Sequence, residues 1–335
     1  MTDMIRTSGL VKRYGKVVAL DGLDLEVPKG TVLGLLGPNG AGKTTAIRIL
    51  STLLDADEGT AEVAGLDVRA EPHKVRERIG LSGQNAAVDE HLTGYENLDM
   101  VGRLYHLGRR KSRTRARELL DRFELDEAAD RPAKTYSGGM RRRLDLAAAL
   151  VAEPDVLFLD EPTTGLDPRS RAQMWETIQD LARGGSTVLL TTQYMEEADR
   201  LADNIVVIDR GRKIAEGTAD ELKAQIGGAR VELVLGETAD LPAAESCVAI
   251  VTDEDVHIDE PTRTVTAGVS GGVEVLGQIL PLLREKDITV VDVGLRHPTL
   301  DDVFLSLTGH VAEEAEEDEE GREGAQPEKV KEVVR

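Results

Sequence analysis

The sequence predicts an α/β fold followed by a small α+β domain and a charged tail. Residues 1 to about 225 alternate short apolar runs with amphipathic stretches, which is typical of helices that cover both faces of a parallel sheet. The pattern changes near 226–230, where the sequence IGGAR is typical of a linker. We therefore expect three parts: residues 1–227, 228–310 and 311–335.

The elements of the first part follow from the periodicity of its apolar residues. Residues 31–36 and 156–159 are almost entirely apolar, as in strands at the centre of a covered sheet. Helical spacing runs through the stretches 93–107, 112–123, 139–152 and 169–182. The pair Asp167-Pro168 predicts the start of the last helix, because aspartate caps a helix and proline fits its first turn.

The second part is expected to mix strands and helices. The sequence pattern predicts strands near 230–235, 247–252, 263–269 and 288–294, and helices near 272–285 and 299–307. From residue 312 the chain reads AEEAEEDEEGREGAQPEKVKEVVR. Dense like charge without aromatic residues predicts disorder for this tail.

Composition limits the classes of function. The 335 residues carry a formal net charge of −21, which argues against a surface that grips nucleic acid or anionic lipid throughout. The single Cys247 cannot form an intramolecular disulfide, so a reducing cytoplasm fits. No run approaches the ~20 apolar residues that cross a bilayer, and the N-terminus lacks the apolar run of a signal peptide. We expect a soluble chain that reaches a membrane only by docking on another protein.

A glycine-rich loop, GPNGAGKTT at residues 37–45, follows an apolar strand and opens a helix. Its glycines allow backbone N–H groups to turn toward phosphate oxygens, and the helix N-terminus favours negative charge there. Lys43 can reach the β- and γ-phosphates, and the Thr44 hydroxyl can ligate Mg²⁺. The spacing therefore predicts a nucleoside triphosphate site.

Two carboxylates end the apolar run VLFLDEP at residues 156–162. Asp160 should lie at the carboxyl end of the sheet, near the phosphates, and hold Mg²⁺ through water. Glu161 can orient or deprotonate the attacking water.

A second anion-binding turn, Ser137-Gly138-Gly139, opens the helix expected at 139–152. One nucleotide does not need two such loops from one chain. Two chains packed head to tail would use both, each capping the nucleotide that the other holds.

These motifs, in this order, resemble the nucleotide-binding subunit of ATP-binding cassette (ABC) transporters, over residues 4 to about 225. The resemblance implies a P-loop NTPase fold of ABC type with a helical signature subdomain, and ATP and Mg²⁺ as the bound species. It implies that Tyr14 stacks on adenine and that Ser137, Gly138 and Gly139 complete the opposite subunit's site. The implied nucleotide loop comprises Gly37, Pro38, Asn39, Gly40, Ala41, Gly42, Lys43, Thr44 and Thr45.

The resemblance also assigns roles outside the two loops. Asp160 and Thr44 hold Mg²⁺, and Glu161 and Lys43 act in hydrolysis. Gln84 touches Mg²⁺ and water and senses the membrane partner, and Asp167 couples the two sites of a dimer. Tyr136 and Met140 depart from the usual leucine and glutamine of the signature, without removing its serine or glycines.

Gln193, in the segment TTQYMEEAD, stands where this family usually has a histidine that bonds the γ-phosphate. A glutamine amide still donates a hydrogen bond but cannot become cationic. We therefore expect Gln193 to be a phosphate-contacting residue of altered type, with the hydrolysis rate in question. Gln193 together with PTLDDVFLSLTG at 298–309 resembles the daunorubicin-resistance subgroup of bacterial drug and antibiotic exporters.

The resemblance implies an ATPase that energises efflux of drugs or related hydrophobic compounds. Its expected partners are a separately encoded membrane-spanning permease and a second ATP-binding subunit, most simply in a homodimer, at the cytoplasmic face of the membrane. Nucleic acid is not expected as a partner. Two alternatives stay open: a soluble ABC ATPase that serves nucleic acid or the ribosome, and a regulator without turnover, against which the intact Lys43, Asp160 and Glu161 argue.

Overall fold

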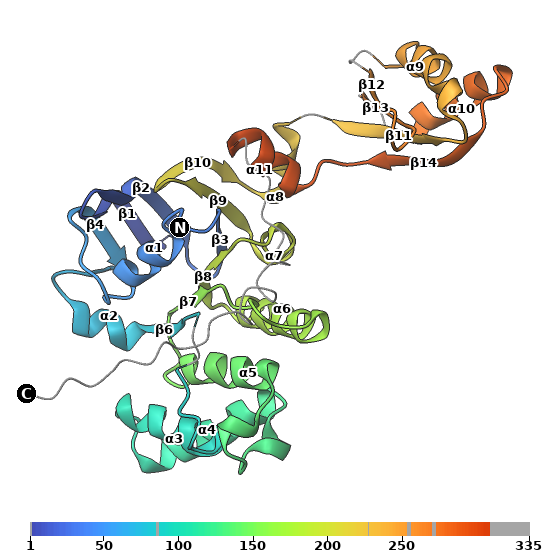
Figure 1. Cartoon of the computed structure of the whole chain (residues 1–335). Helices are drawn as coiled ribbons and strands as arrows, with labels where there is room; N and C mark the ends of the chain where they lie inside the picture. The colour runs from blue at the N-terminus through green and yellow to red at the C-terminus, as the bar shows by residue number, and fades with distance from the viewer. Residues whose placement is uncertain (1, 85–86, 227, 253–255, 270–272, 309–335) are drawn as a thin grey trace, which may run out of the picture.

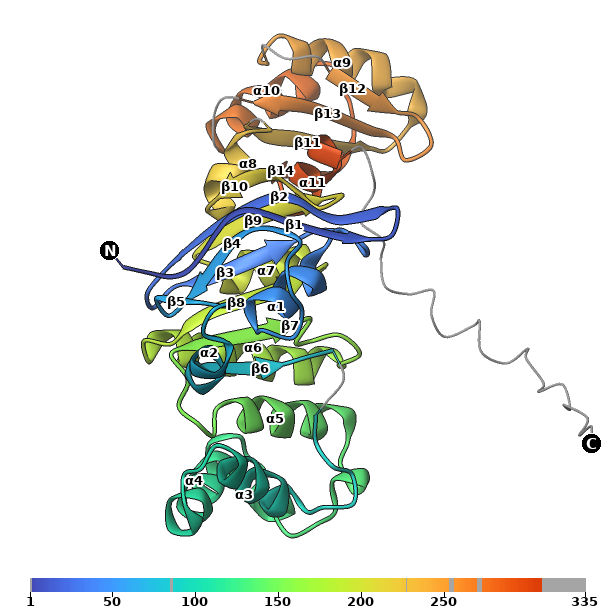
Figure 2. The same ribbon diagram turned by 90° about the vertical axis from the view of Figure 1, so that its left-hand side faces the viewer.

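The structure, a computed structural model, describes residues 2–84, 87–226, 228–252, 256–269 and 273–308. Three sheets organise these residues (Figure 1). The helical part that contains α3, α4 and α5 and the small domain that contains β11 lie at opposite ends of the molecule, with the central sheet between them (Figures 1 and 2).

The central sheet has six strands in the order β10-β9-β3-β8-β7-β6. Neighbouring strands from β9 to β6 are parallel, and β10 pairs with β9 in antiparallel fashion. Every residue of β3, β7 and β8 is buried, which confirms the strands expected at 31–36 and 156–159. The strands are β3 (Val32–Leu36), β6 (Ile79–Ser82), β7 (Val156–Asp160), β8 (Thr187–Thr192), β9 (Asn204–Asp209) and β10 (Arg212–Gly217).

Two layers cover the faces of this sheet. On one face, α1 and a smaller antiparallel sheet enclose a core that includes Ile5, Leu35 and Phe158. On the other, α6 and the helical part enclose a core that includes Leu159, Trp175 and Leu190. The elements are β1 (Asp3–Tyr14), β2 (Val17–Pro28), α1 (Lys43–Leu50), β4 (Glu58–Val63), β5 (Leu66–Asp67), α2 (Pro72–Arg78), α6 (Pro168–Arg183) and α7 (Met195–Leu201).

The helical part contains α3 (Gly94–Leu104), α4 (Arg109–Arg122) and α5 (Gly138–Ala149). Together with α6, these confirm the four helices predicted from spacing. The predicted cap of α6 is also confirmed, because Asp167 Oδ1 accepts a hydrogen bond from the Ser170 N–H at 3.0 Å and Pro168 begins the helix.

The small domain packs two helices on an antiparallel sheet of order β12-β13-β11-β14. Most predicted elements are present, but the strand expected at 247–252 is wrong, because this stretch ends a helix. Leu241, Ala244, Cys247 and Val248 recur at helical spacing and are buried on one face. The elements are β11 (Ala229–Leu235), α9 (Leu241–Ala249), β12 (Val256–Asp259), β13 (Thr264–Val269), α10 (Val273–Glu285) and β14 (Val290–Arg296).

The last described helix, α11 (Leu300–Thr308), lies against the first part of the chain rather than in the core of the small domain. Its Leu300, Val303 and Phe304 are buried in one cluster with residues of α7 and of α8 (Ala219–Ala224). Figure 1 shows α11 beside α8, connected to the small domain by β14.

Two sequence predictions concern the acidic tail and membrane-crossing segments. The predicted disorder of the acidic tail concerns residues 311–335, which lie outside the described residues. Within the described part of the chain, no helix is long and apolar enough to cross a membrane.

Candidate functional site

The predicted phosphate loop lies at the carboxyl edge of the parallel strands, where ligands bind in open α/β sheets. Residues 37–45 follow β3 directly and lead into α1. In the strand register, Leu36 pairs with Thr192 and Asp160 pairs with Thr191. The ends of β3, β7 and β8 therefore bring the glycine loop, the acid pair and the Gln193 segment to one edge.

The glycine loop surrounds a cavity of about 170 Å³. This is smaller than the ~300–1,000 Å³ of pockets that enclose whole small molecules, so it suits a phosphate chain with the nucleoside outside. Its described lining residues are Ala19, Pro38, Asn39, Gly40, Ala41, Gly42, Lys43, Thr44, Thr45, Gln84 and Glu161.

Two glycines of the loop are required by close backbone contacts. A Cβ at Gly37 would lie 2.3 Å from the carbonyl oxygen of Ile208. Gly42 has a φ of +109°, and a Cβ there would lie 2.4 Å from the carbonyl oxygen of Ala19. Any side chain at either position would push the loop away from its supports and change the direction of its N–H groups.

Lys43 lies buried at the base of this cavity. Its Nζ donates hydrogen bonds to the carbonyl oxygens of Gly37, at 2.7 Å, and Pro38, at 3.2 Å, and lies 3.6 Å from Glu161 Oε1. Burial lowers the pKa of the Lys43 ammonium, although the neighbouring Glu161 carboxylate opposes this effect. The ammonium is therefore held where anionic oxygens would replace its backbone partners.

Asp160 ends β7 with its carboxylate between two threonine hydroxyls. Thr191 Oγ1 donates a hydrogen bond to Asp160 Oδ1 at 2.6 Å, and Thr44 Oγ1 donates to the same oxygen at 3.1 Å. The Thr44 hydroxyl and the Asp160 carboxylate thus present adjacent hard oxygen ligands. In the described chain no group of three or more His, Cys, Asp or Glu side chains is placed so that it could hold a metal ion by itself. The pair fits Mg²⁺, which takes few protein ligands beside water and phosphate oxygens.

Glu161 adopts a positive φ of 49°, which is uncommon for a residue other than glycine and is found at functional sites. Its N–H donates to Thr191, with both the hydroxyl and the carbonyl oxygen at 3.1 Å. Its carboxylate lies between Lys43 Nζ and Thr164 Oγ1, the latter at 3.4 Å. The strained backbone carries this carboxylate into the phosphate cavity.

The three remaining residues predicted to act at the nucleotide lie around this cavity to different degrees. Gln84 follows β6 and lines the cavity. Gln193 is half-buried directly after β8, at the same edge. Tyr14 ends β1 with 47% of its surface exposed, outside the described lining residues, with Lys12 Nζ 5.8 Å from its ring centroid.

The signature turn begins α5. Ser137 caps the helix by accepting a hydrogen bond from the Met140 N–H at 3.2 Å. A Cβ at Gly139 would lie 2.7 Å from Ser170 Oγ, so glycine permits the close approach of α6. Apart from its chain neighbours and the backbone of its own helix, no described atom lies within 4 Å of the equivalent point at Gly138, which leaves that side of the turn open.

Two of the sequence predictions concern side chains that also have local structural roles. Besides capping α6, Asp167 accepts a hydrogen bond from Ser170 Oγ at 2.7 Å, and these bonds lower the pKa of its carboxyl group. Tyr136 is buried, and its hydroxyl donates to the carbonyl oxygen of Ala128 at 2.7 Å. The aromatic residue thus anchors the start of the signature turn.

Sequence reasoning missed several buried polar residues around the site. Thr191 holds the acid pair, as described above. Glu197 Oε1 accepts hydrogen bonds from Thr163 Oγ1 at 2.9 Å and Trp175 Nε1 at 3.1 Å, and so connects α7 to α6 and to the turn after Glu161. Arg142 lies in the helix that the signature opens. The first two belong to the segment 191–199, but nothing in the sequence pattern indicates that their side chains turn inward.

Two family models match the chain. One, described as ABC transporter, matches residues 20–164. The other, described as the C-terminal domain of ATP-binding protein DrrA1-3-like, matches residues 217–308. Between them, they include the phosphate loop, the signature turn, the acid pair and most of the small domain.

Curated relatives match over nearly the whole chain. The daunorubicin resistance ATP-binding protein DrrA2 of Streptomyces coeruleorubidus is 58% identical over 92% of this chain and 96% of its own length. The doxorubicin resistance ATP-binding protein DrrA of Mycobacterium tuberculosis strain H37Rv is 47% identical over 90% and 92%. The linearmycin resistance ATP-binding protein LnrL of Bacillus subtilis is 36% identical over 93% and 100%.

Solved structures match about two thirds of the chain. The ATP-binding cassette MJ1267 in its ADP conformation has a TM-score of 0.60 and 27% identity over 66% of this chain and 93% of its own. A dimeric bacterial ABC transporter cassette, MJ0796, has a TM-score of 0.60 and 26% identity over 64% and 98%. The predicted fold and resemblance are confirmed: the chain belongs to the ATP-binding proteins of ABC transporters, in the group of DrrA-like daunorubicin-resistance ATP-binding proteins.

Proposed function

We propose that this chain is the ATP-hydrolysing subunit of an exporter that removes drugs, antibiotics or related hydrophobic compounds. The observation that carries the proposal is the single edge at which the phosphate loop, the acid pair and Gln193 meet. The names of relatives at 36–58% identity add the type of cargo, because they describe resistance to daunorubicin, doxorubicin and linearmycin.

The residues divide the work of hydrolysis among themselves. The N–H groups of the glycine loop and the α1 N-terminus bind phosphate oxygens, and Lys43 binds the β- and γ-phosphates. Glu161 orients and deprotonates the attacking water, for which its place beside the cavity suits it. Gln193 donates its amide to the γ-phosphate, and Tyr14 offers its exposed ring to adenine.

Magnesium ion is the proposed cofactor. Thr44 and Asp160 would hold it, with Gln84, which lines the same cavity, as a third oxygen donor. When bound, the ion neutralises charge on the phosphate oxygens that develops during transfer. The Thr191 hydroxyl keeps Asp160 oriented toward Thr44.

The open signature turn supports a dimer. Ser137 and Gly138 are exposed and do not line the phosphate cavity of the same chain, so they suit the nucleotide of a second subunit. We propose a homodimer packed head to tail, with Asp167 near the contact between the two sites. Closing around two nucleotides and reopening after hydrolysis converts binding energy into a conformational change.

The partner that carries the cargo is a separate membrane-spanning protein. The described chain has no helix able to cross a membrane, and we propose that the permease docks on the helical part that contains α3, α4 and α5. The chain would then work at the cytoplasmic face of the membrane. The small domain supplies no catalytic group in this proposal.

An affinity purification tests the proposal. The tagged chain is isolated from gently solubilised native membranes, and the proteins that accompany it are identified. We expect one polytopic membrane protein at defined stoichiometry. We also expect cells to accumulate more drug when Glu161 is replaced by glutamine in the complex, because export then stops. Ribosomal or nucleic-acid-bound partners without a membrane protein would overturn the transporter assignment in favour of a soluble ATPase.

A further inference from the structure

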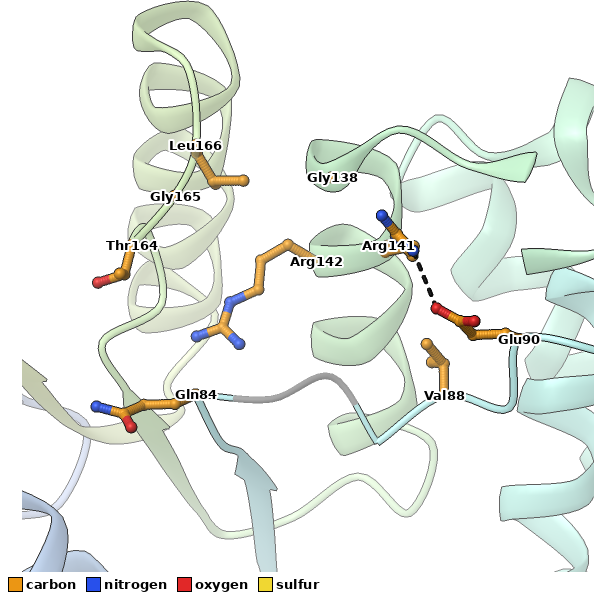
Figure 3. Close-up of a pocket in the computed structure, with 9 residues that line it drawn as sticks. All are labelled: Gln84, Val88, Glu90, Gly138, Arg141, Arg142, Thr164, Gly165 and Leu166. Atoms are coloured by element: carbon orange, nitrogen blue, oxygen red, sulfur yellow. Dashed lines mark hydrogen bonds and ion pairs between the residues drawn. The ribbon is translucent and has the colours of Figure 1, made fainter. Parts of the chain in front are cut away.

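Arg142 lies one turn into α5, behind the signature turn, yet its side chain leaves that helix and enters the catalytic region. Figure 3 shows its guanidinium pointing away from Arg141 and toward Gln84 and Thr164. It lines a cavity of about 480 Å³ that also includes Gly138 and Leu166. Only 7% of the residue is exposed.

The guanidinium donates to the backbone on both sides of the phosphate site. Its Nε donates to the carbonyl oxygen of Pro162 at 2.8 Å. Its Nη2 donates to the carbonyl oxygens of Asp160, at 3.1 Å, and Glu161, at 2.9 Å. Its Nη1 donates to the carbonyl oxygen of Gly83. One planar group thus holds the turn that carries the acid pair and the residue directly before Gln84.

Asp145, one turn further along α5, fixes the other side of the Gln84 segment. Its Oδ2 accepts from Ser82 Oγ at 2.5 Å, and its Oδ1 accepts from the Ala87 N–H at 2.6 Å. It lies 3.9 Å from Arg142 Nη1 and is 2% exposed. The pair therefore contacts Ser82, Gly83 and Ala87 as well as the 160–162 turn.

Such a buried charge is retained at a cost. Removing a guanidinium from water disfavours its charged form, and burial lowers the pKa of Arg142 despite the nearby carboxylates of Asp145 and Asp160. A well-packed apolar residue would hold α5 against the sheet without this penalty. What only the guanidinium supplies is a rigid fork of donors aimed at several carbonyl oxygens at once.

We propose that Arg142, supported by Asp145, is a positioning residue for ATP hydrolysis: it fixes the backbone of Glu161 and Gly83 so that Glu161 and Gln84 converge on the nucleotide of their own subunit. The positive φ of Glu161 adds to the value of such a clamp. A residue held in this sparsely populated region persists only where its surroundings over-determine it. The three carbonyl contacts at 160–162 supply that constraint.

Because Arg142 belongs to the signature helix, the same clamp joins two functions. The N-terminus of α5 faces the partner's nucleotide in the proposed dimer, and the guanidinium three residues beyond Gly139 holds the catalytic turn of its own site. Movement of α5 on contact with the partner's nucleotide is thereby transmitted to Glu161.

The first test compares Arg142→Lys with Arg115→Lys in the full chain, in complex with its membrane partner. Lysine keeps the charge but cannot reproduce the fork. We expect kcat for ATP to fall about tenfold to a hundredfold, as for a small misplacement of catalytic groups, with KM changed less than about threefold. Arg115 also donates to a carbonyl oxygen of the α5 region, that of Leu150 at 3.2 Å, but at the end of α5 opposite the signature turn. Arg115→Lys should leave kcat unchanged.

A structural role alone would give a different result. Arg142→Lys would then lower the melting temperature while kcat of the folded fraction stayed at the wild-type value, and this outcome overturns the proposal. Should Arg142→Lys fail to fold, Asp145→Asn takes its place, because it leaves the guanidinium present while it removes the negative charge beside it and one of the two acceptors for Ser82 and Ala87. Asp145→Asn is expected to reduce kcat by a smaller factor. An unchanged kcat in this variant would overturn the proposal.

A second test uses mixed dimers and rests on the proposed homodimer. One copy carries Glu161→Gln, so that only the other copy hydrolyses ATP. Arg142→Lys is placed either in the active copy or in the inactive copy, whose signature turn completes the active site. We expect the large decrease in kcat when Arg142→Lys is in the active copy. An equal or larger loss from the inactive copy would show that Arg142 serves only the signature turn, and would overturn it. If mixed dimers do not form, the proposed homodimer is contradicted, whereas the first test still decides the role of Arg142.

Discussion

Replacing Thr191 by valine tests how the acid pair is held. Valine has nearly the same shape as threonine, so the packing of β8 is kept and only the hydroxyl is lost. The hydroxyl donates to Asp160 Oδ1 at 2.6 Å and accepts from the Glu161 N–H at 3.1 Å. Hydrogen bonds to charged groups contribute about 1.5–3 kcal/mol and neutral ones about 0.5–1.5 kcal/mol.

The Glu161 N–H also contacts the Thr191 carbonyl oxygen, so its loss is partly compensated. The expected cost of Thr191→Val in the free energy of unfolding is therefore about 2–3 kcal/mol, dominated by the bond to the buried carboxylate. Because Asp160 also loses its orientation toward Thr44, we expect the Mg²⁺ concentration for half-maximal ATP hydrolysis to rise severalfold.

The assays are denaturant unfolding without nucleotide and ATP hydrolysis across a Mg²⁺ titration. Thr191→Ser is the matched control, because serine keeps the hydroxyl and should retain the Mg²⁺ dependence. If Thr191→Val keeps the Mg²⁺ midpoint and the stability of the wild-type chain, the hydroxyl does not hold Asp160 and the reasoning is refuted.

Three further predictions concern other parts of the chain. Gln193→Ala should lower the ATP hydrolysis rate; an unchanged turnover would exclude a phosphate-contacting role. Thermal unfolding across pH should show that the melting temperature of Glu197→Gln rises relative to that of the wild type as pH increases from about 4.5. The reason is that burial raises the pKa of the folded Glu197 carboxyl, so the unfolded wild-type chain releases its proton first; parallel curves would contradict this. Phe304→Ala, at a residue 2% exposed, should cost about 3–5 kcal/mol and release α11 to proteases; an unaltered digestion pattern would show that α11 is not anchored.

The parts of the fold that sequence predicted best are those with a strong local signal. The strands at 31–36 and 156–159 are apolar because both faces of the sheet are covered, and the structure buries every residue of β3 and β7. The start of α6 was predictable because Asp167 and Pro168 act within a few residues of each other. The prediction of a strand at 247–252 was wrong. It gave more weight to the β-branched residues near the end of α9 than to the helical spacing that begins at Leu241.

The site divides in the same way. The glycine loop and the acid pair are contiguous in sequence, and their spacing indicates their chemistry. The roles of Thr191, Arg142 and Glu197 depend on which side of an element each side chain takes and on what lies opposite. Arg142 contacts residues 18 to 59 positions away in sequence. The sequence alone does not distinguish it from its neighbours Arg141 and Arg143. The return of α11 to α7 and α8 is likewise set by tertiary packing.

ATP hydrolysis by the Glu161→Gln variant tests the central claim most directly. The wild-type and variant chains, each with the membrane partner, are compared for binding of ATP and for release of phosphate in the presence of Mg²⁺. The account predicts that the variant binds ATP as well as wild type, because Lys43 and the glycine loop are intact, but releases phosphate at least a hundredfold more slowly. Phosphate release by Glu161→Gln at the wild-type rate would contradict the assignment of Glu161 as the base and, with it, the proposed mechanism.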